Sequence, residues 1–380
     1  MKKNTFLTLR KINKGLLLLH CGSWIQNLLF KLFSRGESFV SMTSEEAEKL
    51  LSEKHNDVKS SAICENKITS QNVDLQIVIP VYKAELFLRK CIDSILNQKT
   101  KYSFKIVAVN DGSPDKSGDI LREYESDERV IVYTQENRGH AGARNTALKE
   151  IFAKYITFVD SDDEMPQGAI DAMLNAAFEN DADIVQGSMD DKTLSGVISC
   201  NYTNQLDTNA PKSAMKGFPC GKLFKSELFK YICFPEKYWF EDSNIGMLIV
   251  PRTKHLVTIP DVVYYYVENP NSITHTHVGK SKTIDSFYVT RALLADQKKL
   301  LDTGEVLDYP IDYMFNQIAI NWHRTFLLGV DVESAIFVLT SEMFNKRFPN
   351  PTSYDSKYKN LCMSLIDKDF ALYRRECAFL

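Results

Sequence analysis

The sequence predicts an α/β fold in which a mostly parallel sheet is flanked by helices. From residue 75 to about residue 190, short apolar runs alternate with segments of helical period, and this alternation is typical of βαβ units. The apolar runs are continuous, as expected for strands whose two faces are both covered. Of the 380 residues, 44% are hydrophobic and 25% are charged, so the chain has enough apolar side chains for a large core.

The elements can be placed in chain order from the changes of hydrophobic period. Five strands are predicted, which are LQIVIPVY from Leu75, FKIVAVND from Phe104, RVIVYTQ from Arg129, KYITFVD from Lys154 and ADIVQGS from Ala182. A helix is predicted after each of the first four strands, beginning near Glu85, Ser117, His140 and Pro166. Pro166 suits the first turn of its helix, because the N–H that proline lacks would have no helical acceptor there.

Four regions are predicted along the chain. Residues 1–40 form an amphipathic helix, and residues 41–74 are a polar linker with a short helix from Thr43 or Ser44 to Lys54. Residues 75–280 form the α/β domain. Residues 281–380 contain three segments with helical spacing, which predict a helical C-terminal region.

The first region is cationic as well as amphipathic. Through residue 36 it has no acidic residue, and its basic residues are Lys2, Lys3, Arg10, Lys11, Lys14, Lys31 and Arg35. Such a helix can lie on an anionic membrane surface or dock on the protein's own core. The apolar run is shorter than the roughly 20 residues of a membrane span, and no clear cleavage site marks a signal peptide. The expected location is the cytoplasmic face of the membrane.

Composition excludes several other classes. The net charge of -3 gives no global footprint for nucleic acid, which is therefore not an expected partner. The eight cysteines include no CxxC pair. Their spacing argues against a zinc site or a disulfide scaffold and fits a reducing compartment. The oligomeric state is left open by the sequence.

Carboxylates follow two of the predicted strands at the point where each strand ends. Asp111 follows the second strand, and Asp160, Asp162 and Asp163 follow the fourth. In open parallel sheets this edge binds ligands. The DxD spacing of Asp160 and Asp162 suits Mg²⁺ or Mn²⁺, which takes one or two carboxylates together with phosphate oxygens. The alternative is an acidic first turn of the following helix.

Two other segments support a ligand site at this edge. Asp111 can accept from the imide N–H of a uracil ring, or it can cap an Asp-Gly-Ser-Pro turn. In NRGHAGARN, a glycine-containing loop enters a helix, and such a start favours anions. Its alternative is a glycine N-cap followed by a surface salt bridge. The candidates for binding a nucleotide ligand from this loop and from the DxD are Gly142, Arg144, Asn145, Asp160 and Ser161.

Together these motifs resemble the nucleotide-binding half of family 2 glycosyltransferases with the GT-A, Rossmann-like fold. The motifs are VIPVYKAELFLRKCIDSILNQ, VNDGSPDKS, NRGHAGARNTAL and FVDSDD. The resemblance is close over about residues 75–190 and looser to about residue 275, through GKLFKSELF, FPEKYWFEDSNIG and YYYVENPNSIT. It implies an inverting transfer from a nucleotide-activated sugar, with a divalent metal ion, Mn²⁺ or Mg²⁺, on the diphosphate.

The resemblance also implies roles for single residues. Pro80, Tyr82 and Asp111 would hold the nucleoside. Asp160 and Asp162 would lie at the diphosphate and the metal ion. YYYVENPNSIT lacks the basic residue often found just after the tyrosines, which puts the acceptor-side residues in doubt.

Asp242 in the FED sequence would be the general base by the same resemblance. One carboxylate is enough for this reaction, because the donor already carries its leaving group. The alternative is that Asp242 caps the helix SNIGMLIV. Trp239 and Glu241 are acceptor-site candidates beside it, although Trp239 also suits a core position.

His275 and His277 are further candidates for the metal ion or a phosphate. Both lie in the sequence SITHTHVGK, which is expected to be a mobile loop. The alternative for each is a solvated histidine without a ligand.

The expected function is therefore a membrane-associated sugar transferase. Its partners would be a nucleotide diphosphate sugar and a glycan or lipid-linked acceptor of a surface polysaccharide. A phosphatase of the haloacid dehalogenase type also has a strand that ends in DxD, but it needs Thr or Val where Glu164 stands. A non-catalytic scaffold that binds nucleotide sugars is the third possibility, and intact acidic motifs count against it.

Overall fold

The computed structural model describes residues 38–380 except 197, 271, 305, 308–310 and 350–355. The predicted amphipathic helix of residues 1–40 therefore lies almost wholly outside the described residues. The chain divides into two compact units. We call the first the sheet unit, which comprises Ser60–Asn271 and Ala292–Asp308. The second is the helical unit, the described part of Met1–Lys59, Ser272–Arg291 and Tyr309–Leu380.

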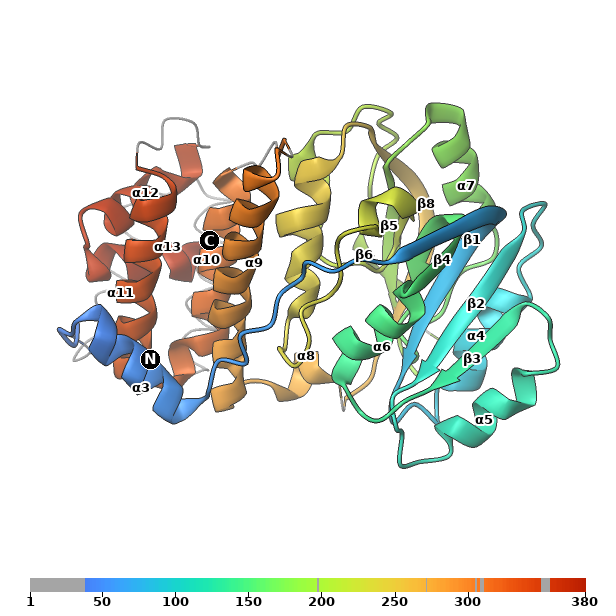
Figure 1. Ribbon diagram of the computed structural model, residues 1–380, viewed down its shortest axis with the longest axis horizontal. Helices are drawn as coiled ribbons and strands as arrows, with labels where there is room; N and C mark the ends of the chain where they lie inside the picture. The colour runs from blue at the N-terminus through green and yellow to red at the C-terminus, as the bar shows by residue number, and fades with distance from the viewer. Residues whose placement is uncertain (1–37, 197, 271, 305, 308–310, 350–355) are drawn as a thin grey trace. The chain divides into compact units, whose positions relative to one another are not determined.

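The sheet unit is built on one mixed sheet (Figure 1). Its described strands are β1 (Lys67–Val81), β2 (Phe104–Asn110), β3 (Val130–Thr134), β4 (Glu150–Phe158), β5 (Ile184–Lys192), β6 (Ile198–Tyr202), β7 (Lys222–Lys225) and β8 (Leu256–Val267). They lie in the order β3-β2-β1-β4-β7-β5-β6, with β8 beside β5. All five predicted strands are present.

Strand β7 was not predicted, and it changes the middle of the sheet. β1 is parallel to β2 and β4, β2 to β3, and β5 to β8. β7 lies between β4 and β5 and is antiparallel to both. Its buried Leu223 and Phe224 pair with residues of both neighbours. Four residues are too few for a hydrophobic period, so the local sequence does not reveal this strand.

The predicted helices form between the strands, as α4 (Leu88–Leu96), α5 (Ser117–Tyr124), α6 (Gly139–Leu148) and α7 (Ala169–Asn180). Several boundaries differ from the prediction. α4 begins at Leu88 rather than near Glu85, and α7 begins at Ala169, so Pro166 lies before the helix and not in its first turn. Two strand boundaries differ for one shared reason. β1 begins at Lys67 rather than Leu75, and β4 begins at Glu150 within the predicted third helix. These extensions pair with each other, Lys67 with Glu150 and Ile68 with Ile151, and such long-range pairing leaves no local signal.

The core of the sheet unit lies on both faces of the first strand. Every residue from Leu75 to Val81 is buried, as the continuous apolar run predicts for a sheet that is covered twice. Leu75, Ile77 and Ile79 belong to the cluster that contains the apolar face of α4, including Cys91 and Ile95.

The described part of residues 281–380 is largely helical, as predicted, although Ala292–Asp308 fall in the sheet unit and the helical unit also includes described residues before Lys59. The described helices of the helical unit are α3 (Ser44–Lys54), α8 (Ile273–Thr276), α9 (Asp285–Asp302, of which Asp285–Arg291 belong here), α10 (Ile311–Thr325), α11 (Val330–Arg347), α12 (Lys359–Ile366) and α13 (Phe370–Phe379). The predicted cap of α3 is confirmed, because the side chains of Thr43 and Glu46 form a reciprocal capping box. None of the helices in the described ranges has the length and hydropathy needed to cross a membrane.

Lys222 is a charged member of the sheet core. The residue is inaccessible to solvent, and its ammonium donates to the carbonyl oxygen of Phe218 at 2.8 Å. The ammonium also lies 4.2 Å from the centroid of the Phe218 ring. Burial lowers the pKa of Lys222 to about 7, because a charged group is poorly solvated in the interior.

We expect Lys222→Met to remove a pH dependence of stability. The unfolded lysine has a pKa of about 10.4, so between pH 7 and pH 10 the unfolded chain binds more protons than the folded chain. The free energy of unfolding of the wild type should therefore rise with pH, by roughly 2–3 kcal/mol from pH 6.5 to pH 9.5 relative to Lys222→Met. Denaturant unfolding of both proteins measures this. Lys225→Met, on the same strand and part-exposed, is the control, and equal pH dependence of wild type and Lys222→Met would contradict the expectation.

Candidate functional site

Three neighbouring parallel strands end at one edge of the sheet, as the sequence predicts. In the register of the sheet, Val81 of β1 pairs with Asn110 of β2, and Val78 of β1 pairs with Phe158 of β4. Pro80 is buried near the end of β1, and Tyr82 follows that strand with 40% of its surface exposed. Tyr82, Asp111 and Asp160 are thus delivered to the same edge.

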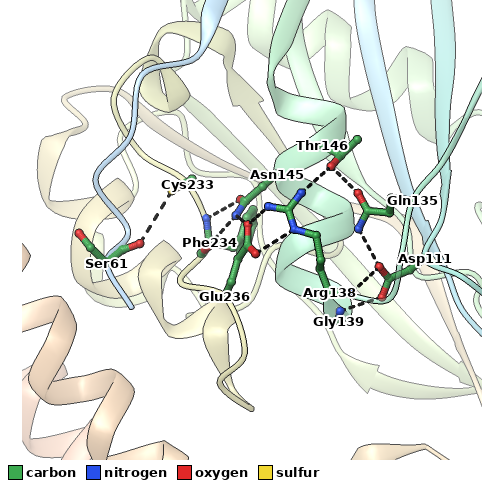
Figure 2. Close-up of polar contacts among 10 residues, drawn as sticks. All are labelled: Ser61, Asp111, Gln135, Arg138, Gly139, Asn145, Thr146, Cys233, Phe234 and Glu236. Atoms are coloured by element: carbon green, nitrogen blue, oxygen red, sulfur yellow. Dashed lines mark hydrogen bonds and ion pairs between the residues drawn. The ribbon is translucent and has the colours of Figure 1, made fainter. Parts of the chain in front are cut away.

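Asp111 caps the start of α6 (Figure 2). Its Oδ1 accepts from the backbone N–H of Arg138 at 2.8 Å and from the amide of Gln135 at 2.7 Å. Its Oδ2 accepts from the N–H of Gly139 at 2.8 Å. Two otherwise unpaired N–H groups of the helix start are satisfied by this carboxylate, which is only 2% exposed. Asp111 therefore has a structural role beside the one predicted from its place at the edge.

The three residues of α6 that were predicted to bind the donor make contacts with different parts of the chain. Gly142 faces Arg138, because a Cβ at Gly142 would lie 2.3 Å from the Cβ of Arg138. Asn145 clamps the backbone of Phe234, donating to its carbonyl oxygen and accepting from its N–H, each at 2.8 Å (Figure 2). Arg144 is 4% exposed. Their contact with the donor remains a prediction, and each of them packs against or bonds to another residue of the chain.

Arg144 joins two carboxylates that are far apart in the sequence. Its Nη2 donates to Oδ1 of Asp160 at 2.8 Å, and its Nη1 donates to Oε1 of Glu241 at 2.7 Å. Burial disfavours the charged guanidinium, but Asp160 and Glu241 outweigh burial, and the pKa of Arg144 is raised. The predicted metal–diphosphate turn and the predicted base turn are thereby brought together.

The carboxylates after β4 differ in their surroundings. Asp160 and Asp162 are partly exposed, whereas Ser161 and Asp163 are buried. Burial alone would raise the pKa of Asp160, but the guanidinium of Arg144 outweighs it and the pKa is lowered. Burial and the charge of Asp160 raise the pKa of Asp162. A cation beside Asp162 would relieve this repulsion.

Asp163 holds the end of β8 against this turn. Its Oδ2 accepts from the hydroxyl of Tyr264 at 2.5 Å, and its Oδ1 accepts from the N–H of Val267 at 2.8 Å. The hydroxyl of Tyr264 also accepts from the N–H of Asp160 at 3.2 Å. Asn269 follows the strand, and its amide donates to Oδ2 of Asp162 at 2.8 Å. Tyr264 and Asn269 are not predicted as site residues, and their only signal in the sequence is the run YYYVEN.

The pair Asp160 and Asp162 fits a divalent ion in its chemistry. Both offer hard oxygen ligands, and Mg²⁺ or Mn²⁺ completes its coordination with phosphate and water oxygens. In the described part of the chain, no group of three or more His, Cys, Asp or Glu side chains is placed to hold a metal ion. The ion would therefore rest on this pair and on the donor.

The two predicted histidines belong to the helical unit. His275 lies in α8, and its side chain is outside the described part of the structure. Nδ1 of His277 is 2.9 Å from the carbonyl oxygen of Ile273. Their contact with a metal ion or phosphate remains a prediction.

The predicted base lies in a turn with unusual backbone. Phe240 is left-handed, with φ of 65°, a conformation that non-glycine residues adopt only when their surroundings hold them there. The 3₁₀ turn η3 (Glu241–Ser243) and the π-helix η4 (Ile245–Ile249) follow, and single π turns are frequent at functional sites.

Asp242 is not the N-cap of either helical turn, because Phe240 and Asn244 occupy those positions. The alternative that Asp242 caps a helix is therefore wrong. Asp242 is partly exposed, and Glu241 beside it is 9% exposed. Trp239 is half-buried and meets the ring of Phe240 edge-on, at 6.3 Å between ring centroids. Of the two acids, Asp242 is the more accessible to an acceptor.

A pocket of about 290 Å³ adjoins this edge. It is lined by Lys83, Glu85, Leu86, Phe87, Pro114, Asp115 and Asn269. Asn269 thus contributes both to the pocket and to the contact with Asp162.

The chain is similar in sequence to known proteins. The family described as Glycosyl transferase family 2 matches residues 76–200. The poly(ribitol-phosphate) beta-glucosyltransferase of Bacillus spizizenii is 34% identical over 205 residues, which are 51% of this chain and 32% of the relative. A Bacillus subtilis protein named as a glycosyltransferase, EpsH, is 31% identical over 252 residues, which are 62% of this chain and 73% of the relative. The chain spans 32%, 62% and 27% of the length of three further relatives.

One solved structure confirms the fold class. The structure of S. aureus TarS 1–349 in complex with UDP-GlcNAc matches with a TM-score of 0.59 and 19% identity, over 79% of this chain and 89% of that chain. At this identity the likeness concerns the fold, which is the predicted α/β architecture of the GT-A type.

Proposed function

The chain belongs to glycosyl transferase family 2, and from this membership we propose that it transfers a sugar, with inversion, from a UDP-sugar to an acceptor hydroxyl. The acceptor is a glycan or a lipid-linked sugar of a capsule, lipopolysaccharide or cell-wall polysaccharide. The observation that carries the proposal is that Arg144 joins Asp160 to Glu241. This contact supports the proposal, because it joins the turn proposed to bind the donor diphosphate to the turn proposed to carry the base.

Two residues are suited to the nucleoside. The half-exposed ring of Tyr82 offers a stacking surface for a uracil ring. Asp111 Oδ2 accepts one hydrogen bond within the described chain, from Gly139, and a carboxylate oxygen has a second lone pair for the imide N–H.

Asp160 and Asp162 would hold the divalent ion, Mg²⁺ or Mn²⁺. When bound, the ion stabilises the negative charge that develops on the leaving diphosphate. Arg144 keeps Asp160 ionised, and the amide of Asn269 orients Asp162 by its hydrogen bond. Hydrogen bonds from residues that do not bind the ion themselves orient the carboxylates that do.

Asp242 is the general base in this proposal. It takes the proton of the acceptor hydroxyl as that oxygen attacks the anomeric carbon. Glu241 is held by Arg144 and is less suited to move toward an acceptor. Trp239 beside the turn offers an aromatic face to the apolar side of a sugar ring.

The names of similar proteins support the substrate classes. One relative is named for poly(ribitol-phosphate), and the TarS structure holds UDP-GlcNAc. A cell-surface polymer as acceptor and a UDP-sugar as donor fit both names. The phosphatase alternative does not fit the family, whereas the scaffold alternative needs an experiment.

Release of UDP is the test of the proposed function. The chain is incubated with a panel of UDP-sugars, with Mn²⁺ or with chelator, and UDP is measured. A donor at 100 times its dissociation constant should also stabilise the fold by about 2.7 kcal/mol. A scaffold would be stabilised without releasing UDP. The proposal would be contradicted if no UDP-sugar stabilised the fold and none led to release of UDP.

Residues 1–37 are expected to bind the inner face of the membrane. Each of their basic side chains near anionic lipid contributes about 1 kcal/mol. A variant that lacks them should lose binding to vesicles with anionic lipid and keep donor turnover. The cut is placed before Phe39, because its ring packs 5.2 Å from that of Phe370. Vesicles of zwitterionic lipid are the control, and unchanged binding to anionic vesicles would exclude these residues as the anchor.

A further inference from the structure

Helix α6 connects the donor edge of the sheet to the turn that carries Asp242. At its start, Asp111 accepts from the N–H groups of Arg138 and Gly139 (Figure 2). Further along, Arg144 donates to Asp160. Both carboxylate-bearing strand ends are thus attached to one helix.

Helix α6 also contacts residues 234–241, which lead into the turn that carries Asp242. Arg138 forms an ion pair with Glu236, and Asn145 binds both backbone groups of Phe234 (Figure 2). The guanidinium of Arg144 lies over the ring of Phe234, 5.3 Å from its centroid. Arg144 then donates to Glu241, directly before Asp242. This segment is held at its start and at its end.

We infer that Arg144 and Glu241 are positioning residues that set the place of Asp242 relative to the donor. The inference rests on the proposed function. Arg144 of α6 contacts both the turn after β4, at Asp160, and the turn that carries Asp242, at Glu241. Its planar guanidinium presents two nitrogens in a fixed geometry, which a lysine cannot do. Buried ion pairs contribute little to stability on balance, but they can specify geometry.

The contact between Arg144 and Glu241 lies next to a strained backbone position. The left-handed φ of Phe240 costs free energy and persists only where neighbouring contacts fix it. The bond from Arg144 to Glu241 is made at the next residue. Without it, the turn should relax, and Asp242 should move relative to the anomeric carbon.

Separating donor affinity from turnover tests the inference. In Glu241→Ala, Asp160 keeps its contact with Arg144, so the KM for the donor should stay within about threefold of the wild type. The turnover number for transfer should fall by about 10- to 100-fold, because misplacement of a reacting group by about 1 Å has this effect. Glu241→Gln should recover part of the loss, since its amide oxygen still accepts from Arg144.

Arg144→Lys should change both the KM for the donor and the turnover number, because a lysine lacks the two guanidinium nitrogens that bond to Asp160 and Glu241 at the same time. The double variant Arg144→Lys/Glu241→Ala should turn over no more slowly than Arg144→Lys alone, as expected for residues that act as a unit. Arg122→Met is the matched control. It breaks an exposed arginine–aspartate pair on α5 and should change neither quantity.

A merely structural role predicts a lower melting temperature with unchanged turnover per folded molecule. Wild-type turnover of folded Glu241→Ala would overturn the inference, and so would additive losses in the double variant. If Glu241→Ala does not fold, Glu241→Gln decides by the same measurements. Failure of the wild type to turn over any UDP-sugar would instead overturn the proposed function, and this inference with it.

Discussion

Asp242→Asn is expected to lower the rate of sugar transfer by about 10²–10⁴-fold, the usual contribution of general-base catalysis. Asparagine keeps the shape of the side chain but cannot accept the proton. Folding should survive, because Asp242 is partly exposed and is the N-cap of neither helical turn around it. Donor binding should survive as well, since the residues proposed to bind the donor lie at the ends of β1, β2 and β4.

Three measurements on this variant separate the possible roles. Melting temperature reports folding, UDP affinity with Mn²⁺ reports the donor site, and the initial rate with acceptor reports the base. Asp261→Asn, an exposed aspartate in β8, is the matched control and should be normal in all three. Near-wild-type transfer by folded Asp242→Asn would refute the assignment of the base.

The edge that gathers the acidic residues could be predicted from the sequence because it depends on local patterns. Continuous apolar runs marked β1, β2 and β4, and the alternation with helices made them parallel. Neighbouring parallel strands end at the same edge of a sheet, so Asp111 and Asp160 were expected to lie at that edge together. No contact between distant segments was needed for this conclusion.

The contacts of single residues could not be predicted in the same way. Arg144 was placed in the donor site because it follows a glycine loop at a helix start, but its partner Glu241 is 97 residues away. Asp163 follows the same strand as Asp160 and Asp162, yet its carboxylate accepts a hydrogen bond from the hydroxyl of Tyr264, 101 residues further on. Spacing within a motif shows which residues share a turn, but the fold decides which of them face a ligand.

Asp162→Asn is expected to reduce transfer at least as strongly as the loss of the base, by weakening the binding of the metal ion and the donor diphosphate together. Asp162 is partly exposed, and its pKa is raised by partial burial and by the charge of Asp160. A divalent ion would offset this repulsion, because it takes hard oxygen ligands from one or two carboxylates and from the diphosphate. The neutral amide removes one of those charges and keeps the shape.

Direct binding measurements make the test independent of turnover. Titration of Mn²⁺ and UDP by calorimetry should show affinity in the wild type that chelator abolishes and that Asp162→Asn weakens by about 100-fold, within the range that charged ligands contribute at such sites. Asn269→Ala removes the hydrogen bond to Asp162 but leaves both carboxylates in place, and it should weaken Mn²⁺ less, by about tenfold. Full transfer in excess chelator would show that Asp160 and Asp162 act without a metal ion. In that case the positive charge at the diphosphate would have to come from the protein, and Arg144, already held by Asp160, would be the first side chain to test.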